Sequence, residues 1–180
     1  ETALLGLCVS QNFFLTAFFL MVVTLPFFLL IAMFGEKGED CSYRFLTLNA
    51  VSHGLILILL LLVYVSGESH PLPNELGMLL LIGAFVLRLP VWPLHGWFMD
   101  LSRSSDATLL AAATGGLVPV LLLTFVKLAT SLFSAHLENF SDAFAVVGSI
   151  LMVIGALGAL GEQHFRSFAA NLSLWMVGAV

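Results

Sequence analysis

The residue best suited to charge chemistry is an arginine inside an apolar segment. Arg88 lies within residues 76–94, a stretch that is otherwise almost entirely apolar. A cation inside a membrane-spanning segment costs about 2.5–3.5 kcal/mol near the helix centre on insertion scales, so it faces a bundle interior or a wet path. Two interpretations stay open. Arg88 is a charged element of a proton or ion path, or its long side chain extends to the nearby interface.

Prolines are predicted to break the helices that position these side chains. Pro90 and Pro93 follow Arg88 directly, and Pro26 and Pro119 lie inside two other apolar segments. Proline removes a backbone donor and disfavours helix in the residue before it. A break after Arg88 would free carbonyl groups near the charge and allow water to gather there.

Three further candidates for an ion path are a histidine in an apolar segment and a His–Asp pair after the prolines. His53 lies inside the apolar segment 45–66, and His95 and Asp100 follow Pro93. Imidazole titrates near neutral pH and can relay protons. The alternatives are a hydrogen-bonded packing role for His53, and solvated or helix-capping roles for His95 and Asp100 beside interfacial tryptophans.

Lys127 and His164 complete the set of ion-path candidates. Lys127 lies toward one end of the apolar segment 107–134, where an ammonium group can also reach the interface. His164 lies between Glu162 and Arg166, a cluster that could equally cap helix ends. The sequence contains no phosphate-binding loop, metal-ligand set or nucleophile triad. We therefore expect no catalytic residue, no cofactor and no metal site.

The composition requires lipid as the solvent for these elements. The chain has 60% hydrophobic and 9% charged residues, whereas soluble domains have about 45–50% and about 25%. The segments are apolar all round, unlike the alternating strands of a β-barrel. We predict an all-α integral membrane protein, a polytopic bundle of about five complete spanning helices with partial helices at both ends. The predicted spans are 12–35, 45–66, 76–94, 107–134 and 142–161, and the partial helices are 1–10 and the stretch from 167.

Charge indicates the partners and the orientation of the bundle. The net charge is −5 with six Lys and Arg in total, which argues against nucleic acid as a partner and leaves the lipid bilayer. The first, third and fifth loops carry four basic residues, and the second and fourth carry none. Positive loops face the cytoplasm or matrix, so the odd loops are predicted to lie on that side. The four residues are Lys37, Arg44, Arg103 and Arg166.

The stretch from Arg88 to Asp100 resembles a family signature. It reads Arg-Leu-Pro-Val-Trp-Pro-Leu-His-Gly-Trp-Phe-Met-Asp, and it is similar to Lys-x-Pro-x-x-Pro-Leu-His-x-Trp-Leu-Pro-Asp of the antiporter-like subunits of respiratory complex I. The chain M (subunit 4) type fits best, and it is related to cation/proton antiporter and membrane-bound hydrogenase subunits. Weaker matches run from Gly6 to Pro26 and from Gln163 to Gly178.

The resemblance implies a membrane subunit of an ion (proton) translocating complex of the complex I and antiporter superfamily, such as NADH:quinone oxidoreductase. Residues 1–180 would then form a single transmembrane domain, a middle portion of a longer subunit. Its partners would be other membrane subunits, and the redox chemistry would belong to partner subunits. The expected location is a bacterial cytoplasmic membrane or a mitochondrial inner membrane.

Departures from the family pattern support an alternative. The family's glutamate before the helix proline falls on Met21, its lysine on Arg88, its next central lysine on Pro119, and the aspartate of a Thr-Asp-x-Lys motif on His164. A guanidinium group keeps its proton throughout the physiological range. The alternative is therefore a degenerate antiporter-like subunit with a structural or assembly role and no pumping of its own.

Overall fold

The computed structural model describes residues 2–10, 12–34, 38–66, 74–104, 106–133 and 137–179. All regular elements within these ranges are helical, which confirms the predicted all-α bundle. Four helices within these ranges are long and apolar enough to cross a membrane, one fewer than the five predicted spans, because the predicted span 76–94 forms a helix of only 15 residues, Asn74–Arg88. The elements are α1 (Thr2–Val9), α2 (Phe13–Phe34), α3 (Gly38–Ser66), α4 (Asn74–Arg88), α5 (Gly96–Ser104), α6 (Ala107–Ala112), a π-helical turn η1 (Ala113–Leu117), α7 (Val118–Phe133), α8 (Leu137–Gly161) and α9 (Phe165–Ala179).

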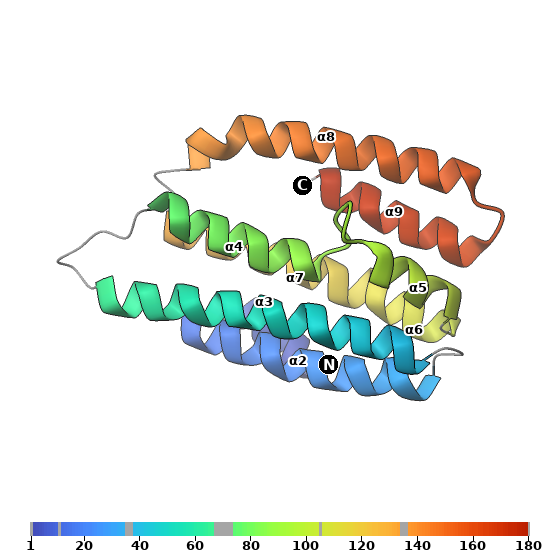
Figure 1. The fold of residues 1–180 in the computed structure, drawn as a ribbon, viewed down its shortest axis with the longest axis horizontal. Coiled ribbons are helices and arrows are strands. Elements are labelled where there is room, and N and C mark those ends of the chain that lie inside the picture. Colours follow the sequence, from blue (N-terminus) through green and yellow to red (C-terminus); the bar gives the residue numbers. More distant parts are fainter. Residues whose placement is uncertain are drawn as a thin grey trace.

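The long helices lie side by side with alternating directions (Figure 1). α3 packs against both α2 and α4, α4 against α7, and α8 against α9. The helix ends around α5, including the start of α3 and the start of α9, lie at the same end of the bundle in Figure 1. Arg44, Arg103 and Glu162 therefore belong to one end, as the alternation of charged loops in the sequence requires.

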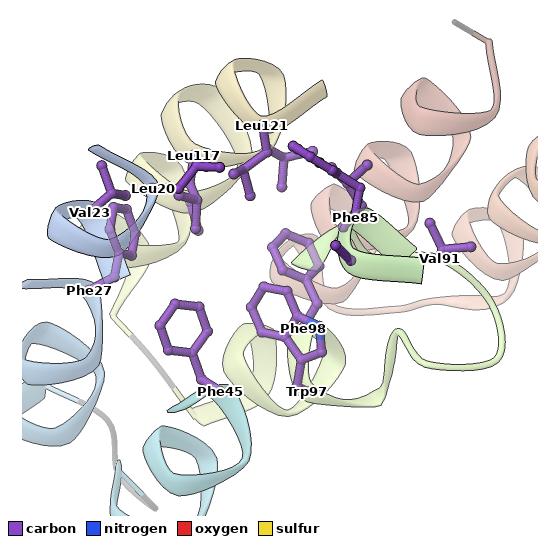
Figure 2. Packing of buried hydrophobic residues seen from close by; sticks show 14 of the residues in the cluster. Leu20, Val23, Phe27, Phe45, Phe85, Val91, Trp97, Phe98, Leu117 and Leu121 are labelled. Atoms are coloured by element: carbon purple, nitrogen blue, oxygen red, sulfur yellow. The ribbon is translucent and has the colours of Figure 1, made fainter. Parts of the chain in front are cut away.

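A continuous apolar core joins the helices that surround Arg88. In Figure 2 the side chains of α2, the π-helical turn and α7 face the aromatic rings of α3 and α5. The ring centroids of Phe45 and Trp97 are 5.3 Å apart, as are those of Trp97 and Phe98. Because lipid is as apolar as these side chains, such close packing rather than hydrophobic transfer holds the helices together in a membrane.

Several helix ends differ from the prediction. α4 ends at Arg88, six residues before the predicted end at residue 94, because Pro90 and Pro93 cannot donate to the helix. The segment predicted as a loop after His95 forms α5 instead, a short helix with polar residues on one side. α3 begins at Gly38 rather than residue 45 and α8 at Leu137 rather than residue 142. Counting apolar residues misses helical turns that extend beyond the apolar run.

Two of the four prolines do not break a helix. Pro26 lies inside α2, which continues on both sides, so the predicted interruption there is wrong. One missing hydrogen bond is tolerated in a packed apolar helix. Pro119 is the second residue of α7 and follows the π-helical turn after one residue, Val118, whose N–H donates to the carbonyl oxygen of Ala113. The wider turn makes room for the proline ring, which would otherwise meet the carbonyl four residues earlier.

The α8–α9 pair packs through glycines. A Cβ atom on Gly178 would lie 2.5 Å from the carbonyl oxygen of Gly148, and one on Gly155 would lie 2.6 Å from the backbone nitrogen of Trp175. These distances are too short for any larger residue. Small residues let two helix backbones approach closely, which is how helices associate when lipid is the solvent.

Candidate functional site

The arginine at the end of α4 points into the bundle and not to the interface. Arg88 is 2% exposed, and it is the largest of the fully buried side chains among the described residues. Its guanidinium group contacts α2 and α3. The interpretation of Arg88 as a side chain that extends to the interface is therefore wrong for this structure. We use the term Arg88 centre for Arg88, Ser52, His53, Asn49 and the carbonyl group of Leu20.

Ser52 fixes one side of the guanidinium group. Nε of Arg88 donates to Oγ of Ser52 at 2.7 Å, and that hydroxyl donates to the carbonyl oxygen of Ala84 at 2.7 Å. Ser52 is fully buried, so no water competes for these bonds. The hydroxyl thus joins α3 to α4 and orients its free lone pair toward the cation.

His53 contacts the other side of the guanidinium group. Nη2 of Arg88 lies 2.9 Å from Nε2 of His53 and 2.7 Å from Nδ1, while Nδ1 lies 2.8 Å from the carbonyl oxygen of Asn49. Only the tautomer with its proton on Nδ1 satisfies both neighbours. Nδ1–H then donates to Asn49, and the Nε2 lone pair accepts from Arg88. The contact therefore requires a neutral imidazole.

Three polar residues on one face of α3 build this arrangement. Asn49, Ser52 and His53 are spaced i, i+3 and i+4, so they share a helix face. The side-chain amide of Asn49 is buried and donates to the carbonyl oxygen of Phe45 at 2.8 Å. A polar face within an otherwise apolar spanning helix is the sequence signal for the partner of a buried charge, and His53 is the one residue of this face among the predicted ion-path candidates.

The third contact of Arg88 comes from α2. Nη1 lies 3.5 Å from the carbonyl oxygen of Leu20, a weak hydrogen bond by its length. Leu20 precedes Met21, whose side chain is 58% exposed. Leu20 lies 68 residues before Arg88 and accepts with its main-chain carbonyl, so no pattern of side chains in the sequence could have identified this contact.

Within the described ranges, no carboxylate lies within ion-pair distance of Arg88. The ion pairs found there are Arg44–Asp100 at 2.7 Å and Arg103–Glu162 at 3.9 Å, both at one end of the bundle. Buried charges in proteins are normally paired, since an isolated ion in an apolar medium is costly. The Arg88 centre therefore holds a cation with neutral dipoles alone, and its electrostatic energy responds to any charge that comes near.

A groove between α2 and α3 runs past the centre. Its volume is about 510 Å³, and His53 and Thr24 contribute polar groups to a wall that is otherwise apolar. Met21 and Leu57 line it and are exposed, so the groove opens on the surface of the described chain. His53 thus has Arg88 on one side and this groove, called the α2–α3 groove below, on the other.

Lys127 lies in a separate polar cluster. Its Nζ donates to the carbonyl oxygen of Ser10, whose hydroxyl is 2.8 Å from Oγ1 of Thr16. A cavity of about 250 Å³ adjoins Lys127 and Thr124. This cluster joins α7 to the junction of α1 and α2, and Lys127 is half-buried there.

The other candidates lie toward the end of the bundle that holds α5. His95 is in the turn before α5, and Asp100 on α5 pairs with Arg44. His164 is exposed between α8 and α9. Nδ1 of His95 and Nε1 of Trp97 are buried and have no hydrogen-bond partner among the described residues. Of the predicted residues, the structure brings together Arg88 and His53, and it places the others elsewhere.

The described residues form no cluster of side chains that could hold a metal ion. No group of three or more His, Cys, Asp or Glu side chains comes together within the residues that the structure describes. What the Arg88 centre offers is a fixed cation beside an ionisable ring in a low-dielectric interior.

Comparison with known proteins gives a consistent result. Residues 10–178 match the family described as NADH:quinone oxidoreductase/Mrp antiporter, TM. The chain is 28% identical to NAD(P)H-quinone oxidoreductase chain 4 1 of Synechococcus sp. (strain JA-2-3B'a(2-13)) over 194 residues, which cover 99% of this chain and 36% of that protein. It is 28% identical to the chloroplastic NAD(P)H-quinone oxidoreductase chain 4 of Chaetosphaeridium globosum, with 98% and 38% covered.

A bacterial relative extends the match. NADH-quinone oxidoreductase subunit M of Buchnera aphidicola subsp. Schizaphis graminum (strain Sg) is 23% identical over 198 residues, which cover 97% of this chain and 39% of that protein. The chain therefore spans little more than a third of the length of the curated relatives that it matches.

Proposed function

Because the chain belongs to the NADH:quinone oxidoreductase/Mrp antiporter transmembrane family, we propose that it is part of a membrane subunit that moves protons across a bacterial or organellar membrane. In this proposal the redox chemistry resides in partner subunits. The chain contributes a single transmembrane domain, in which the Arg88 centre stores and redistributes charge. Its neighbours are the lipid bilayer and other membrane subunits of the same complex, and not nucleic acid.

One observation carries the proposal, which is a buried cation held by neutral groups. A purely structural arginine would be expected beside a carboxylate, because an ion pair reduces the cost of burial. Arg88 instead has Ser52, His53 and a carbonyl group as its partners among the described residues. A charge in this state is poorly compensated, so the arrival or departure of a proton nearby changes its energy strongly in a low-dielectric interior. This property is what charge-driven transport requires.

The departures from the family pattern are compatible with this proposal, although the charged residues differ from those of the family. Met21 and Arg88 occupy the positions of the family's glutamate and lysine, so the pair of opposite charges is replaced by one permanent cation. Arg88 keeps its charge and modulates the path, and a neighbouring group has to carry the proton. His95 and Asp100 would lie where the path meets one end of the bundle.

Proton uptake by vesicles that contain the complete complex tests the proposal. Arg88→Ala should abolish most of the uptake that is driven by the redox partners, because the remaining dipoles of Ser52 and His53 have no cation to act upon. Arg103→Ala is the matched control, since it removes an exposed arginine from a loose ion pair at the bundle end. We expect uptake close to that of the unaltered complex in the control.

Two results would contradict the proposal. If Arg88→Ala folds and supports normal uptake, Arg88 has no part in the transport. If the unaltered complex carries out its redox reaction without any proton uptake, the chain fits the alternative, a structural or assembly role with no pumping of its own. Sodium-loaded vesicles in a parallel measurement distinguish which cation moves.

A further inference from the structure

The Arg88 centre contains one side chain whose neutral form has a lone pair that can bind a proton, and we infer that this group, His53, is the proton carrier of the chain. The inference rests on the proposed function and assigns its proton-binding step to one side chain. The guanidinium group of Arg88 does not release a proton in the physiological range. The hydroxyl of Ser52 and the amide of Asn49 are not bases in water, whereas a neutral imidazole ring is.

The geometry makes proton binding and the Arg88 contact mutually exclusive. Nδ1–H of His53 is used by the carbonyl oxygen of Asn49, so Nε2 is the atom left to accept both from Arg88 and from an incoming proton. A proton on Nε2 would place one N–H donor against another and two positive charges side by side. The protonated ring must therefore leave Arg88, and the neutral ring can return to it.

The two partners differ in how firmly they are held. Arg88 is 2% exposed and remains bound to Ser52 when the ring departs, and Ser52 is itself held by Ala84. His53 is only half-buried, and its side chain lines the α2–α3 groove. The imidazole is thus the member of the pair that moves, and the guanidinium is the member that stays.

The α2–α3 groove supplies the space for the second position of the ring. Its volume of about 510 Å³ accommodates an imidazole many times over. Thr24, in the same wall, donates its hydroxyl proton to the carbonyl oxygen of Leu20 at 2.9 Å. The hydroxyl oxygen keeps lone pairs that can accept from a protonated ring. The groove therefore offers both room and an acceptor.

Charged groups on the neighbouring helices do not disturb this switch. α3 packs against α2, α4 and α5. The described part of α2 has no titratable side chain, and on α4 the other charged group, Glu75, lies at the opposite helix end from Arg88. On α5, Asp100 pairs with Arg44, nine residues before His53, and Arg103 pairs with Glu162. Arg88 is the charge that His53 senses.

His53 therefore has two states. In one, the neutral ring accepts from Arg88 inside the bundle. In the other, the ring carries a proton on Nε2 and faces the α2–α3 groove. The proton arrives from water and returns to water at the same nitrogen atom, and no other bond forms or breaks. A change in the field at Arg88, caused by a partner subunit, would shift the balance between the two states.

Transport by the complete complex in vesicles is the first test. His53→Gln keeps a donor and an acceptor but cannot carry a proton, so uptake should fall by about 100-fold or more, the range of a lost proton-transfer group. Thr47→Ala is the matched control, an exposed α3 residue whose hydroxyl bonds to its own helix, and it should transport normally. If the His53→Gln complex transports like the unaltered one, the inference is overturned while the proposed function stands.

The second test does not depend on transport. Nitrogen-15 NMR of the full subunit, with the His53 ring assigned by its loss in His53→Gln and the Arg88 signals by Arg88→Lys, follows the pair as the pH is lowered while the subunit stays folded. We expect the tautomer with the proton on Nδ1 at high pH. Protonation at lower pH should be accompanied by a change in the Arg88 signals. A ring that never protonates, or that does so with the Arg88 signals unchanged, would overturn the inference whatever the transport result.

Discussion

Replacing Ser52 with alanine should destabilise the bundle more than the loss of any other single hydroxyl discussed here. The side chain is fully buried and takes part in two hydrogen bonds of 2.7 Å, one from Nε of Arg88 and one to the carbonyl oxygen of Ala84. Ser52→Ala leaves a charged N–H group buried without its acceptor. A hydrogen bond to a charged group contributes about 1.5–3 kcal/mol, and a neutral bond between membrane helices adds about 0.6 kcal/mol. We therefore expect a loss of about 2–3.5 kcal/mol.

Ser173→Ala is the control for that loss. Ser173 is also buried, but its hydroxyl donates to the carbonyl oxygen of Ala169 in its own helix. Removing it should cost well under about 1 kcal/mol, because the carbonyl keeps its helical bond. Equilibrium unfolding in mixed micelles with rising denaturing detergent measures both variants. If the two variants lose similar free energy of unfolding, the bond from Arg88 to Ser52 does not contribute as the structure indicates.

Three further predictions follow from the packing and the charges. Gly178→Ala should lower the free energy of unfolding by about 1–3 kcal/mol, because the added Cβ would lie 2.5 Å from the carbonyl oxygen of Gly148. Gly54 has open space around it, so Gly54→Ala should raise the free energy of unfolding by about 0.5–1 kcal/mol. Equal effects of the two substitutions in thermal unfolding would contradict the close contact between α8 and α9. Arg44→Ala should cost less than about 1 kcal/mol and lose that effect in high salt, since the side chains of the Arg44–Asp100 pair are 67% and 41% exposed; a larger, salt-independent loss would mean that the pair is buried in the complex. The orientation of the bundle can be tested with an impermeant maleimide in a background without native cysteines. The reagent should label Arg103→Cys from the cytoplasmic or matrix side and Glu138→Cys from the opposite side, because the basic loops face inward. Labelling of both variants from one side would refute the predicted orientation.

The helices were predictable because lipid imposes a simple requirement on length and composition. Runs of apolar residues identified the long helices and showed Arg88 as a cation within an apolar run, and Pro90 and Pro93 predicted a break after Arg88. What the apolar count could not predict were helical turns outside the hydrocarbon region. α5 is the main example, because its residues read as a polar loop until they are placed against α3 and α9.

The site was only partly predictable for a related reason. Arg88 and His53 stand out as ionisable groups in apolar segments, but nothing in the sequence pairs them. Their contact depends on how α4 packs against α3, which is a tertiary property. The carbonyl group of Leu20 is a main-chain acceptor and has no side-chain signature. Pro26 shows the opposite error, since a local rule predicted a break that the packing of α2 overrides.

The π-helical turn at Ala113–Leu117 determines which way the rest of that helix faces. Such a turn holds one residue more than an α-helical turn, and one residue corresponds to a rotation of about 100° around the axis. Shortening Ala113–Leu117 by one residue would therefore swing Lys127 by more than a quarter of a circle away from Ser10. The single additional residue acts as an angular offset, which directs the ammonium group of Lys127 toward Ser10 at the junction of α1 and α2.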